Sequence, residues 1–267
     1  MRTYRCRKMI RAESSLSLSI DEPIAVLTID RVAKYNALSE EVWERFPILV
    51  GDACAAPGTR VIIVRGAARN FAAGADIDEF DRVFADRAAA LRYLEAMIAA
   101  TDAIAAAPVP VIAAIEGLCI GAGVAVALAC DLRIADAAAS FAVTPAKLGL
   151  LYSLTDTRRL VAAVGSSRAK DLLFTGARID AAQALSIGLI DVIGGQQDVA
   201  AKAAAIAAQS PWTHAHTKSI LRAIESGRTT ETDETRSWFA DASQTNDFKE
   251  GLAAFQDRRR PEFPTRR

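Results

Sequence analysis

Short strands that alternate with helices are the feature that most constrains the fold of this chain. Residues 60–65 and 111–115 are rich in β-branched residues and are predicted as strands, and each leads through a glycine-bearing turn into a helical segment. The helices are predicted over 78–106 and from the second turn to Cys130, and 132–135 forms another strand. Parallel strands need helical crossovers of this kind, so the order predicts an α/β fold.

The first part of the chain has a simpler pattern. Residues 16–20 alternate between apolar and polar, residues 24–29 are rich in β-branched residues, and Asp21-Glu22-Pro23 between them predicts a hairpin turn. A helix is then predicted to begin after Ser39 and to run towards Ala56, because Glu40 and Glu41 favour the positive end of a helix.

Beyond Gly195 the pattern is only helical. We therefore divide the chain into a core, residues 1–195, and a helical C-terminal segment, residues 196–267, which we expect to cover the functional site and to mediate self-association. The helices of this segment are predicted over 199–208, 211–226 and 231–257.

The charges argue against several classes of function. Lysine and arginine number 32, and so do aspartate and glutamate, so the chain lacks the positive charge on which non-specific nucleic-acid binding depends. His214 and His216 have no partners at metal-ligand spacing, so we expect no metal site.

The apolar segments predict neither a membrane span nor a disulfide framework. The apolar run 118–130 is short for a span and ends at Asp131. Of the cysteines at positions 6, 54, 119 and 130, Cys119 and Cys130 lie in apolar runs and are predicted to be buried, reduced thiols. The basic first residues lack the apolar core of a secretory signal, so we expect a cytoplasmic protein.

The two glycine-bearing turns are the strongest candidates for a functional site. They are Asn70-Phe-Ala-Ala-Gly-Ala-Asp76 and Glu116-Gly-Leu-Cys-Ile-Gly-Ala-Gly123. A strand that passes into a helix through small residues leaves backbone N–H groups unpaired at the helix start, where they can bind negative charge. Two such groups directed at one oxygen would form an oxyanion hole.

The second turn also permits a different interpretation. The stretch Gly121-Ala-Gly-Val-Ala-Val126 resembles a dinucleotide-binding fingerprint without its third glycine, with Asp136 at the end of the next strand. The unit begins after an unrelated α/β stretch, and its acidic residue is closer to the glycines than the fingerprint requires. We therefore rank a nicotinamide enzyme below the oxyanion-hole hypothesis.

Together the two turns resemble the crotonase (enoyl-CoA hydratase/isomerase) superfamily, and the resemblance covers almost the whole chain. Six motifs stand in the family's order: Asn36-Ala-Leu38; Phe71-Ala-Ala-Gly-Ala-Asp-Ile77; Glu116-Gly-Leu-Cys-Ile-Gly-Ala-Gly123; Ala129-Cys-Asp131 with Arg133-Ile-Ala135; Phe174-Thr-Gly176 with Ala181, Ala184 and Gly188-Leu189; and Glu250-Gly-Leu-Ala-Ala-Phe255 with Arg258 and Pro261.

This resemblance implies a fold and a site. The fold would be a crotonase-like spiral of ββα units with a C-terminal helical segment. The amides of Ala75 and Ala122 would hold the carbonyl oxygen of an acyl-CoA thioester. Trimers or hexamers are usual in the family. No separate cofactor is expected, since CoA is part of the substrate.

Further residues of the matching motifs would contact CoA. Phe255 and Arg258 would lie near its adenosine end, across a subunit interface. In the first turn, Asp76 is also a candidate cap for the following helix. The residues assigned to CoA binding are Ala73, Asp76, Ile77, Phe255 and Arg258.

The sequence departs from the hydratase pattern at two positions. Hydratase members add water with two glutamates, one shortly after the second glycine turn and one directly after a later proline. Ala125 and Ala146 stand at those positions here. A methyl group cannot transfer a proton, so hydration by two glutamates is not expected.

The stretch Thr144-Pro-Ala-Lys-Leu-Gly-Leu-Leu-Tyr152 resembles methylmalonyl-CoA decarboxylase-like members instead. Loss of carbon dioxide from a malonyl-type thioester needs no prior proton abstraction, and an oxyanion hole stabilises the enolate that it leaves. The hydroxyls of Thr144 and Tyr152 would orient the carboxylate or return a proton. We therefore favour decarboxylation of a methylmalonyl-CoA-like substrate.

Two alternatives remain at this stage. The chain is a hydratase, isomerase or lyase of the same family that uses another acid/base, for which Asp156 is the candidate, or it is a non-catalytic acyl-CoA-binding subunit. Lys147 and Arg159 are expected at the surface or at a CoA phosphate.

Overall fold

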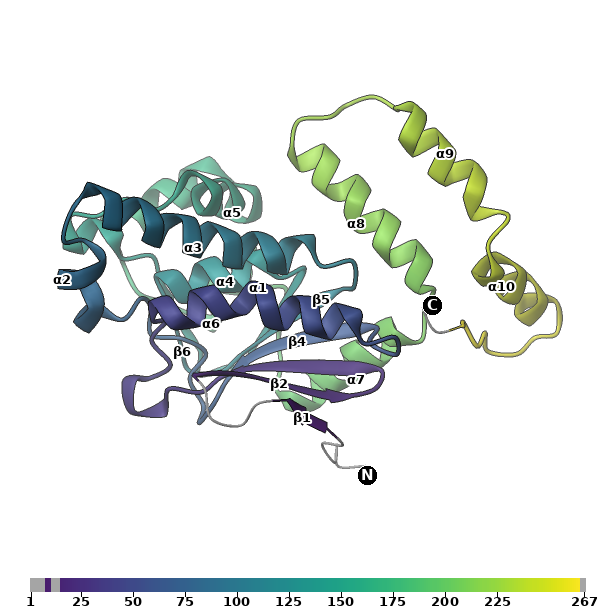
Figure 1. Cartoon of the computed structure of the whole chain (residues 1–267), viewed down its shortest axis with the longest axis horizontal. Helices are drawn as coiled ribbons and strands as arrows, with labels where there is room; N and C mark the ends of the chain where they lie inside the picture. The colour runs from purple at the N-terminus through teal and green to yellow at the C-terminus, as the bar shows by residue number, and fades with distance from the viewer. Residues whose placement is uncertain (1–7, 11–14, 265–267) are drawn as a thin grey trace.

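The fold was analysed in a computed structural model, which describes residues 8–10 and 15–264. A seven-stranded sheet forms its centre (Figure 1), with the strand order β1-β2-β3-β4-β5-β7-β10. These strands are β1 (Lys8–Ile10), β2 (Leu16–Asp21), β3 (Ile24–Ile29), β4 (Val61–Gly66), β5 (Val111–Ile115), β7 (Leu132–Ala135) and β10 (Val192–Ile193).

The sheet confirms the predicted α/β order. β1, β2 and β3 pair antiparallel, with the predicted hairpin turn between β2 and β3. From β3 onward every pair in this sheet is parallel. β4 and β5 are neighbours, with Arg65 opposite Ala114, so the turns that follow these two strands leave the same edge of the sheet.

Helices cover both faces of this sheet. On one face, α1 and the strands share the larger core, in which Trp43, Phe46 and Leu27 are fully buried. On the other face, Val199 and Ala203 of α7 pack on Ile63 and its neighbours. The helices of the core region are α1 (Glu40–Ala55), α2 (Phe80–Val83), α3 (Arg87–Ala106), α4 (Ala122–Ala129), α5 (Leu154–Thr175), α6 (Ala181–Ser186) and α7 (Gln196–Ala207).

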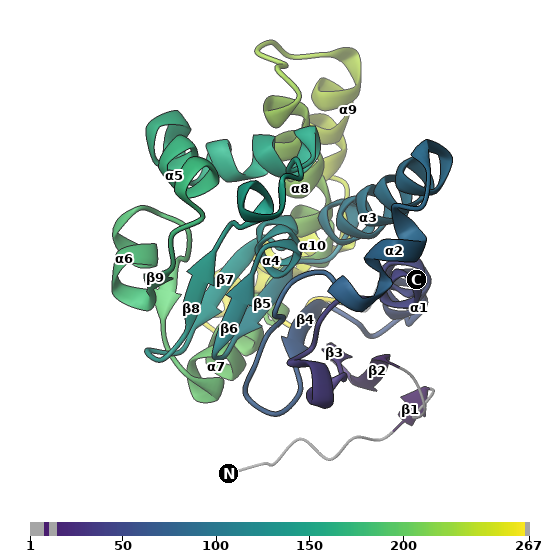
Figure 2. The ribbon, with the colours of Figure 1, turned by 90° about the vertical axis from the view of Figure 1, so that its left-hand side faces the viewer.

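A second, three-stranded sheet lies beside the first (Figure 2), in the order β6-β8-β9. Its strands are β6 (Leu118–Ile120), β8 (Ser140–Ala142) and β9 (Ile179–Asp180). β6 lies inside the stretch that the sequence predicted as a glycine turn. A three-residue strand whose paired residues are 22 positions away in sequence has no local periodicity that would have revealed it.

Two segments that were predicted as single continuous helices are each divided in the structure. The segment 78–106 is divided into a 3₁₀ turn (Ile77–Glu79), α2 and α3, because Asp86 caps a new helix by accepting a hydrogen bond from the Ala89 amide at 2.8 Å. The segment 231–257 is divided into α9 (Asp233–Ala242) and α10 (Asn246–Gln256), where Thr245 caps α10 in the same way.

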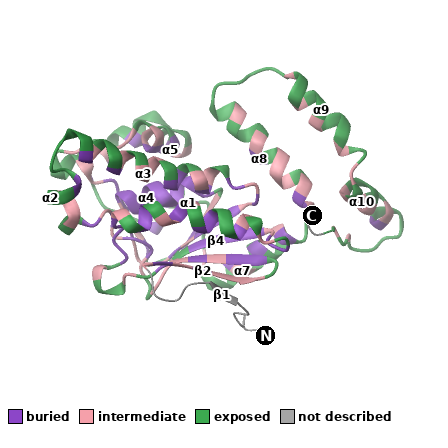
Figure 3. Ribbon diagram, viewed as in Figure 1, coloured by how far each residue is buried: buried purple, intermediate pink, exposed green. Residues whose placement is uncertain are grey.

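The C-terminal helices project from the core (Figure 1), and most of their surface is exposed (Figure 3). They are α8 (Pro211–Glu225), α9 and α10. Phe239 and Phe255 are 88% and 83% exposed, which is unusual for large apolar side chains. α7, which the sequence division placed in the C-terminal segment, packs on the sheet instead of projecting.

The described cysteines confirm the predicted thiols. Cys119 and Cys130 are buried and free, and burial raises the pKa of both, that of Cys130 to about 12. Cys6 lies outside the described residues. Within the described part of the chain, no helix has both the length and the apolar character that a membrane span requires.

One buried charge attaches α8 to the core, and it generates the first prediction. The Lys218 ammonium forms an ion pair with Asp131 and donates to the Val109 carbonyl at 3.3 Å. Replacing Lys218 by methionine removes the ion pair of Asp131, which still accepts from the Val111 amide, and removes a donor from the Val109 carbonyl. We therefore expect the free energy of unfolding to fall by about 1–3 kcal/mol. Amide hydrogen exchange in α8 should accelerate. Lys202→Met, on the exposed side of α7, is the control, and an equal loss in both variants would contradict this assignment.

Candidate active site at the two glycine turns

The two turns predicted to carry the site lie against each other. The Ala72 amide donates to the Leu118 carbonyl, and the Ile120 amide donates to the Ala72 carbonyl, both at 2.9 Å. A Cβ added at Gly123 would lie 2.6 Å from the Ala72 oxygen, so only glycine permits this approach. The fold thus brings the turn after β4 into contact with the turn after β5.

The first turn is fixed from its other side by Leu38. The Leu38 amide donates to the Gly74 carbonyl at 2.7 Å, and the Leu38 carbonyl accepts from the Asp76 amide at 2.9 Å. These two bonds form a parallel bridge between Leu38 and Ala75, which leaves the Ala75 N–H on the side away from Leu38. Gly74 makes this possible because its φ of +114° breaks the strand alternation.

The buried Asn36 side chain fixes the conformation of the segment 36–38, which contacts the first turn. Its side chain is fully buried, donates to the Ala67 and Asn70 carbonyls at 2.8 and 2.6 Å, and accepts from the Arg31 amide at 3.0 Å. Asn36 also adopts a left-handed backbone with φ of 60°, which asparagine tolerates better than most residues. The Asn36-Ala-Leu38 motif therefore acts as a support for the first turn.

The second turn ends in a helix start. Gly121, at φ +52°, donates its amide to the Ala142 carbonyl at 2.7 Å, and α4 begins at Ala122. Among the described residues, neither the Ala75 amide nor the Ala122 amide donates a backbone hydrogen bond. Ala75 is half-buried, and Ala122 is buried, with 7% of its surface exposed. Two unpaired amides therefore stand on turns that touch each other.

Thr144 and Tyr152, both predicted from sequence, lie beside the second turn. The Tyr152 hydroxyl donates to the Gly121 carbonyl at 3.3 Å. A Cβ added at Gly121 would lie 3.3 Å from the Thr144 hydroxyl oxygen. Burial raises the pKa of Tyr152 well above its usual value, and the nearby charge of Asp156 adds to this effect. Tyr152 is therefore a neutral hydrogen-bond donor at physiological pH.

Asp156 lies in the first turn of α5 and is 2% exposed. The Ser153 hydroxyl donates to its Oδ2 at 2.7 Å, whereas Oδ1 has no hydrogen-bond partner and is 3.6 Å from Nη1 of Arg159. Burial raises the pKa of Asp156, and the bond from Ser153 and the charge of Arg159 only partly oppose this. A buried carboxyl with a raised pKa is suited to proton transfer.

Arg159 was expected at the surface or at a CoA phosphate, and the surface location was wrong. Its side chain is buried between Asp156 and Asp102, with Nη2 2.7 Å from a carboxylate oxygen of Asp102. The spacing of three residues between Asp156 and Arg159 was visible in the sequence and is typical of an ion pair on a helix. It was missed because the helix α5 itself was not predicted.

Asp76 has the capping role that its position predicted. Its side chain accepts from the Asp78 amide at the start of the 3₁₀ turn, and it forms ion pairs with Arg31 at 2.6 Å and Lys34 at 3.0 Å. Burial opposes its ionisation, but the hydrogen bonds from Arg31 and Lys34 outweigh burial and lower the pKa of Asp76. The carboxylate therefore holds the end of the first turn in place.

The remaining predicted residues are distributed over the molecule. Ala73 donates its amide to the Tyr35 carbonyl, and Ile77 is exposed next to the first turn. Phe255 and Arg258 belong to the α10 region, which lies at the opposite end of the molecule from α2 (Figure 1). One copy of the chain does not bring these two residues to the turns.

The two alanines at the hydratase positions lie in different surroundings. Ala125 is fully buried inside α4, and Ala146 is exposed in the 3₁₀ turn Pro145–Leu148. Neither side chain can exchange a proton. Among the described residues no group of histidine, cysteine, aspartate or glutamate has the arrangement of a metal site.

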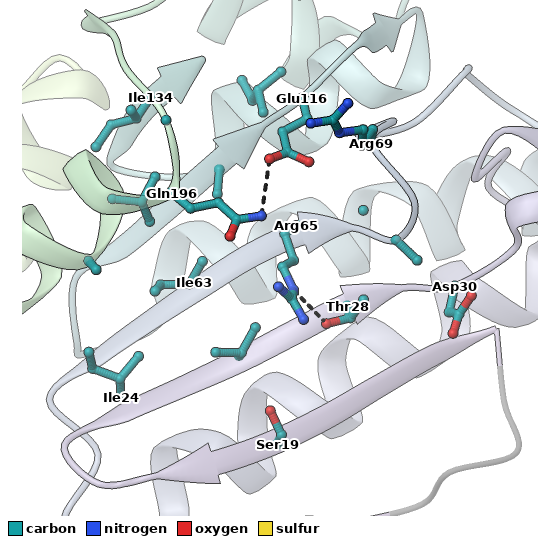
Figure 4. A pocket seen from close by; sticks show the side chains of 18 of the residues that line it. Ser19, Ile24, Thr28, Asp30, Ile63, Arg65, Arg69, Glu116, Ile134 and Gln196 are labelled. Atoms are coloured by element: carbon teal, nitrogen blue, oxygen red, sulfur yellow. Dashed lines mark hydrogen bonds between the residues drawn. The ribbon is translucent and has the colours of Figure 1, made fainter. Parts of the chain in front are cut away.

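A cavity of about 780 Å³ lies elsewhere, over the sheet face that α7 only partly covers. Figure 4 shows its floor with Ile24, Ile63 and Ile134, and two hydrogen bonds above it. One joins Gln196 to Glu116 and the other joins Arg65 to Thr28, both at 3.2 Å. Its lining includes none of Ala75, Ala122, Thr144, Tyr152 and Asp156.

Comparison with known proteins gives a consistent result. Residues 19–266 match the family model described as enoyl-CoA hydratase/isomerase. A Mycobacterium tuberculosis protein named "Probable enoyl-CoA hydratase" is 33% identical over 252 residues, which cover 92% of this chain and 96% of that protein. The peroxisomal Delta(3,5)-Delta(2,4)-dienoyl-CoA isomerase of Arabidopsis thaliana is 28% identical and covers 98% of each chain.

Solved structures agree with the sequence relatives. The crystal structure of an enoyl-CoA hydratase/isomerase family protein from Hyphomonas neptunium superimposes with a TM-score of 0.92 at 43% identity. The match covers 95% of this chain and 98% of that one. The fold and the family implied by the sequence motifs are confirmed.

The Asp76 ion pairs generate the second prediction. The folded state lowers the pKa of Asp76, so its charge stabilises the fold above the unfolded value of 3.8 and this contribution disappears as the pH falls through the folded value. We expect Asp76→Asn to lower the free energy of unfolding by about 1–3 kcal/mol at pH 7. The difference from the unmutated protein should shrink below a pH of about 3.8.

Urea unfolding at several pH values measures this difference. Asp78→Asn is the control, because Asp78 is 78% exposed and pairs only with Lys34 among the described residues. A loss in Asp76→Asn that is the same at pH 7 and at pH 3 would contradict the role of the charge.

Proposed function

This chain belongs to the enoyl-CoA hydratase/isomerase family and acts on acyl-CoA, and we propose that the amides of Ala75 and Ala122 bind the thioester oxygen of its substrate. The observation that carries this proposal is that both amides lack a backbone partner and stand on turns that contact each other. Each donor of an oxyanion hole contributes roughly 3–4 kcal/mol to the stabilisation of the charge that develops on the oxygen.

We further propose that the reaction is the decarboxylation of a methylmalonyl-CoA-like thioester. Ala125 and Ala146 leave no carboxylate for two-glutamate hydration. In decarboxylation, the bond between the α-carbon and the carboxylate breaks, carbon dioxide leaves, and the electron pair moves to the thioester oxygen as an enolate. The two amides stabilise that enolate, and a proton added at the α-carbon gives the product thioester.

Thr144 fits the carboxylate side of this reaction. Its hydroxyl lies next to Gly121, and no hydrogen bond of its side chain is present among the described residues. A free hydroxyl beside the oxyanion amides is able to donate to the substrate carboxylate and hold it perpendicular to the thioester plane. Thr144 is then the source of the returning proton.

A second candidate is an isomerisation in which Asp156 moves a proton. Three observations support it: the carboxyl is buried, its pKa is raised, and Oδ1 has no hydrogen-bond partner. One relative of the chain is named as a dienoyl-CoA isomerase. This candidate requires Asp156 to approach the α- or γ-carbon of the bound acyl group.

The exposed C-terminal helices suggest how the CoA site is completed. Phe239 and Phe255 expose most of their apolar surface in one copy of the chain, and Arg258 lies just beyond α10. We propose that this segment packs against a second copy in a trimer or hexamer, and that Phe255 and Arg258 reach the adenosine end of CoA there. Burial of the two phenylalanines would stabilise the assembly.

The choice of reaction gives the third prediction. The full chain is incubated separately with methylmalonyl-CoA and with crotonyl-CoA, and the thioesters are followed by mass spectrometry. Release of propionyl-CoA from the first substrate, with no hydration of the second, is expected. Hydration of crotonyl-CoA would contradict the proposal, and tight binding of both esters without any turnover would identify a non-catalytic binder instead.

The role of Asp156 gives the fourth prediction. Decarboxylation requires no base before the carbon–carbon bond breaks, so Asp156→Asn should change kcat for methylmalonyl-CoA by less than about tenfold. If Asp156 transfers the proton, kcat should fall by about 10²–10⁴, and kcat/KM of the unmutated protein should depend on an apparent pKa above 3.8.

Asp102→Asn is the matched control for this variant. It also removes a carboxylate partner of Arg159, but from an exposed position. An effect that both variants share therefore reports on Arg159, and an effect confined to Asp156→Asn reports on the buried carboxyl.

A further inference from the structure

We propose that Tyr152 is a positioning residue that strengthens the Ala122 amide through the carbonyl of the same peptide unit. The proposal rests on the function proposed above, because it assumes that the Ala122 N–H binds the thioester oxygen. It assigns Tyr152 a role on the protein backbone and not on the substrate.

The geometry starts from one peptide bond. The carbonyl of Gly121 and the N–H of Ala122 belong to the same planar unit and share its π electrons. The Tyr152 hydroxyl donates to the Gly121 oxygen at 3.3 Å. A hydrogen bond accepted by the oxygen draws electron density towards it and makes the N–H at the other end a stronger donor, an effect of about 10–30% per bond in condensed phases.

The first turn has the same construction with a different donor. The Gly74 carbonyl, which belongs to the peptide unit of the Ala75 amide, accepts from the Leu38 amide at 2.7 Å. Each proposed oxyanion amide thus belongs to a peptide unit whose carbonyl already accepts a hydrogen bond. In the first turn the donor is a backbone amide, which only a substitution by proline would remove. In the second turn Tyr152 supplies a donor that a single substitution removes.

The Gly121 carbonyl also accepts from the Val124 and Ala125 amides, at 3.0 and 3.3 Å. These are the ordinary bonds of the first turn of α4, and they come from the helix side of the oxygen. Tyr152 approaches from outside α4, since it directly precedes Ser153, the N-cap of α5. Its bond therefore ties α5 to the start of α4 and fixes the plane of the peptide unit.

The state of the hydroxyl supports a donor role. A tyrosine has one O–H hydrogen, and here that hydrogen is used on the Gly121 oxygen. Burial raises the pKa of Tyr152 well above its usual value, so the hydroxyl keeps this hydrogen. To return a proton to the substrate, Tyr152 would first have to break its bond to Gly121. A positioning role needs no such rearrangement.

The test measures the polarisation of a bound thioester directly. Butyryl-CoA carrying ¹³C at the thioester carbonyl has no double bond to hydrate and no carboxylate to lose, and its carbonyl stretch is read by isotope-edited infrared spectroscopy. Binding to the unmutated full-length chain should lower the stretching frequency relative to free butyryl-CoA. In Tyr152→Phe this downshift should be smaller by roughly 5–15%, because only one of the two amides loses its 10–30% strengthening.

A second experiment measures kcat and KM with the acyl-CoA that the unmutated chain turns over. Tyr152→Phe should lower kcat about two- to eightfold while KM changes less than about twofold, since the bond acts on a donor that matters most when the oxygen is charged. Tyr93→Phe is the matched control. It removes a hydroxyl from another buried tyrosine, whose partner is the Trp43 indole and not a turn carbonyl. Tyr93→Phe should leave the downshift unchanged.

A replacement that keeps the tyrosine ring but strengthens its hydroxyl as a donor tests whether the downshift can also be increased. Tyr152→3-fluorotyrosine has a more acidic hydroxyl and is a better hydrogen-bond donor, so the downshift should increase. This variant also covers the case in which Tyr152→Phe does not fold, because the ring and its hydroxyl both remain in place.

The outcomes separate the inference from the function on which it rests. If the unmutated chain binds butyryl-CoA without any downshift, the two amides do not hold the oxygen, and both proposals fail. If the downshift is present and equal in the unmutated chain, in Tyr152→Phe and in Tyr152→3-fluorotyrosine, the oxyanion hole stands and the role of Tyr152 is overturned. A downshift that follows the donor strength of residue 152 supports the inference.

Discussion

The pairing of Ala72 with Cys119 is the contact on which the site depends. β4 and β5 are parallel neighbours, so the turns that follow them leave the sheet at one edge, but neighbouring strands alone do not fix the turns relative to each other. The bond that the Ala72 amide donates to Leu118 and the bond that the Ala72 carbonyl accepts from Ile120 hold the two turns together. Everything else in the site, including the supporting segment at Leu38 and the start of α4, is arranged around this bridge.

The elements that could be predicted from the sequence are those with local signals. β4, β5 and α1 were predicted closely because β-branched runs and the cap at Ser39 are read within a few residues. β6 and the other strands of the small sheet were missed because they are two or three residues long and owe their conformation to distant partners. Tertiary pairing decides such strands, and propensity does not.

The candidate site, like the fold, has features that the sequence predicted and features that depend on tertiary structure. Glycine spacing and order were visible, and they located both turns, although the proposed functional groups there are backbone amides that every residue except proline possesses. The bond from Tyr152 to Gly121 and the burial of Arg159 were not predictable, since both depend on where α5 lies. Sequence therefore predicted which residues form the candidate site, and the structure adds which atoms of those residues face one another.

The arrangement of the two hydroxyl residues narrows the course of a reaction at this site. If Tyr152 keeps its hydrogen on the Gly121 carbonyl, it is not a proton source, and the buried Asp156 is held by Ser153 and lies close to Arg159. The groups left to meet the substrate are then two amides and the Thr144 hydroxyl. Such a set stabilises negative charge on oxygen but abstracts protons poorly. It favours a substrate that generates its own enolate by losing a carboxylate over one that must first be deprotonated.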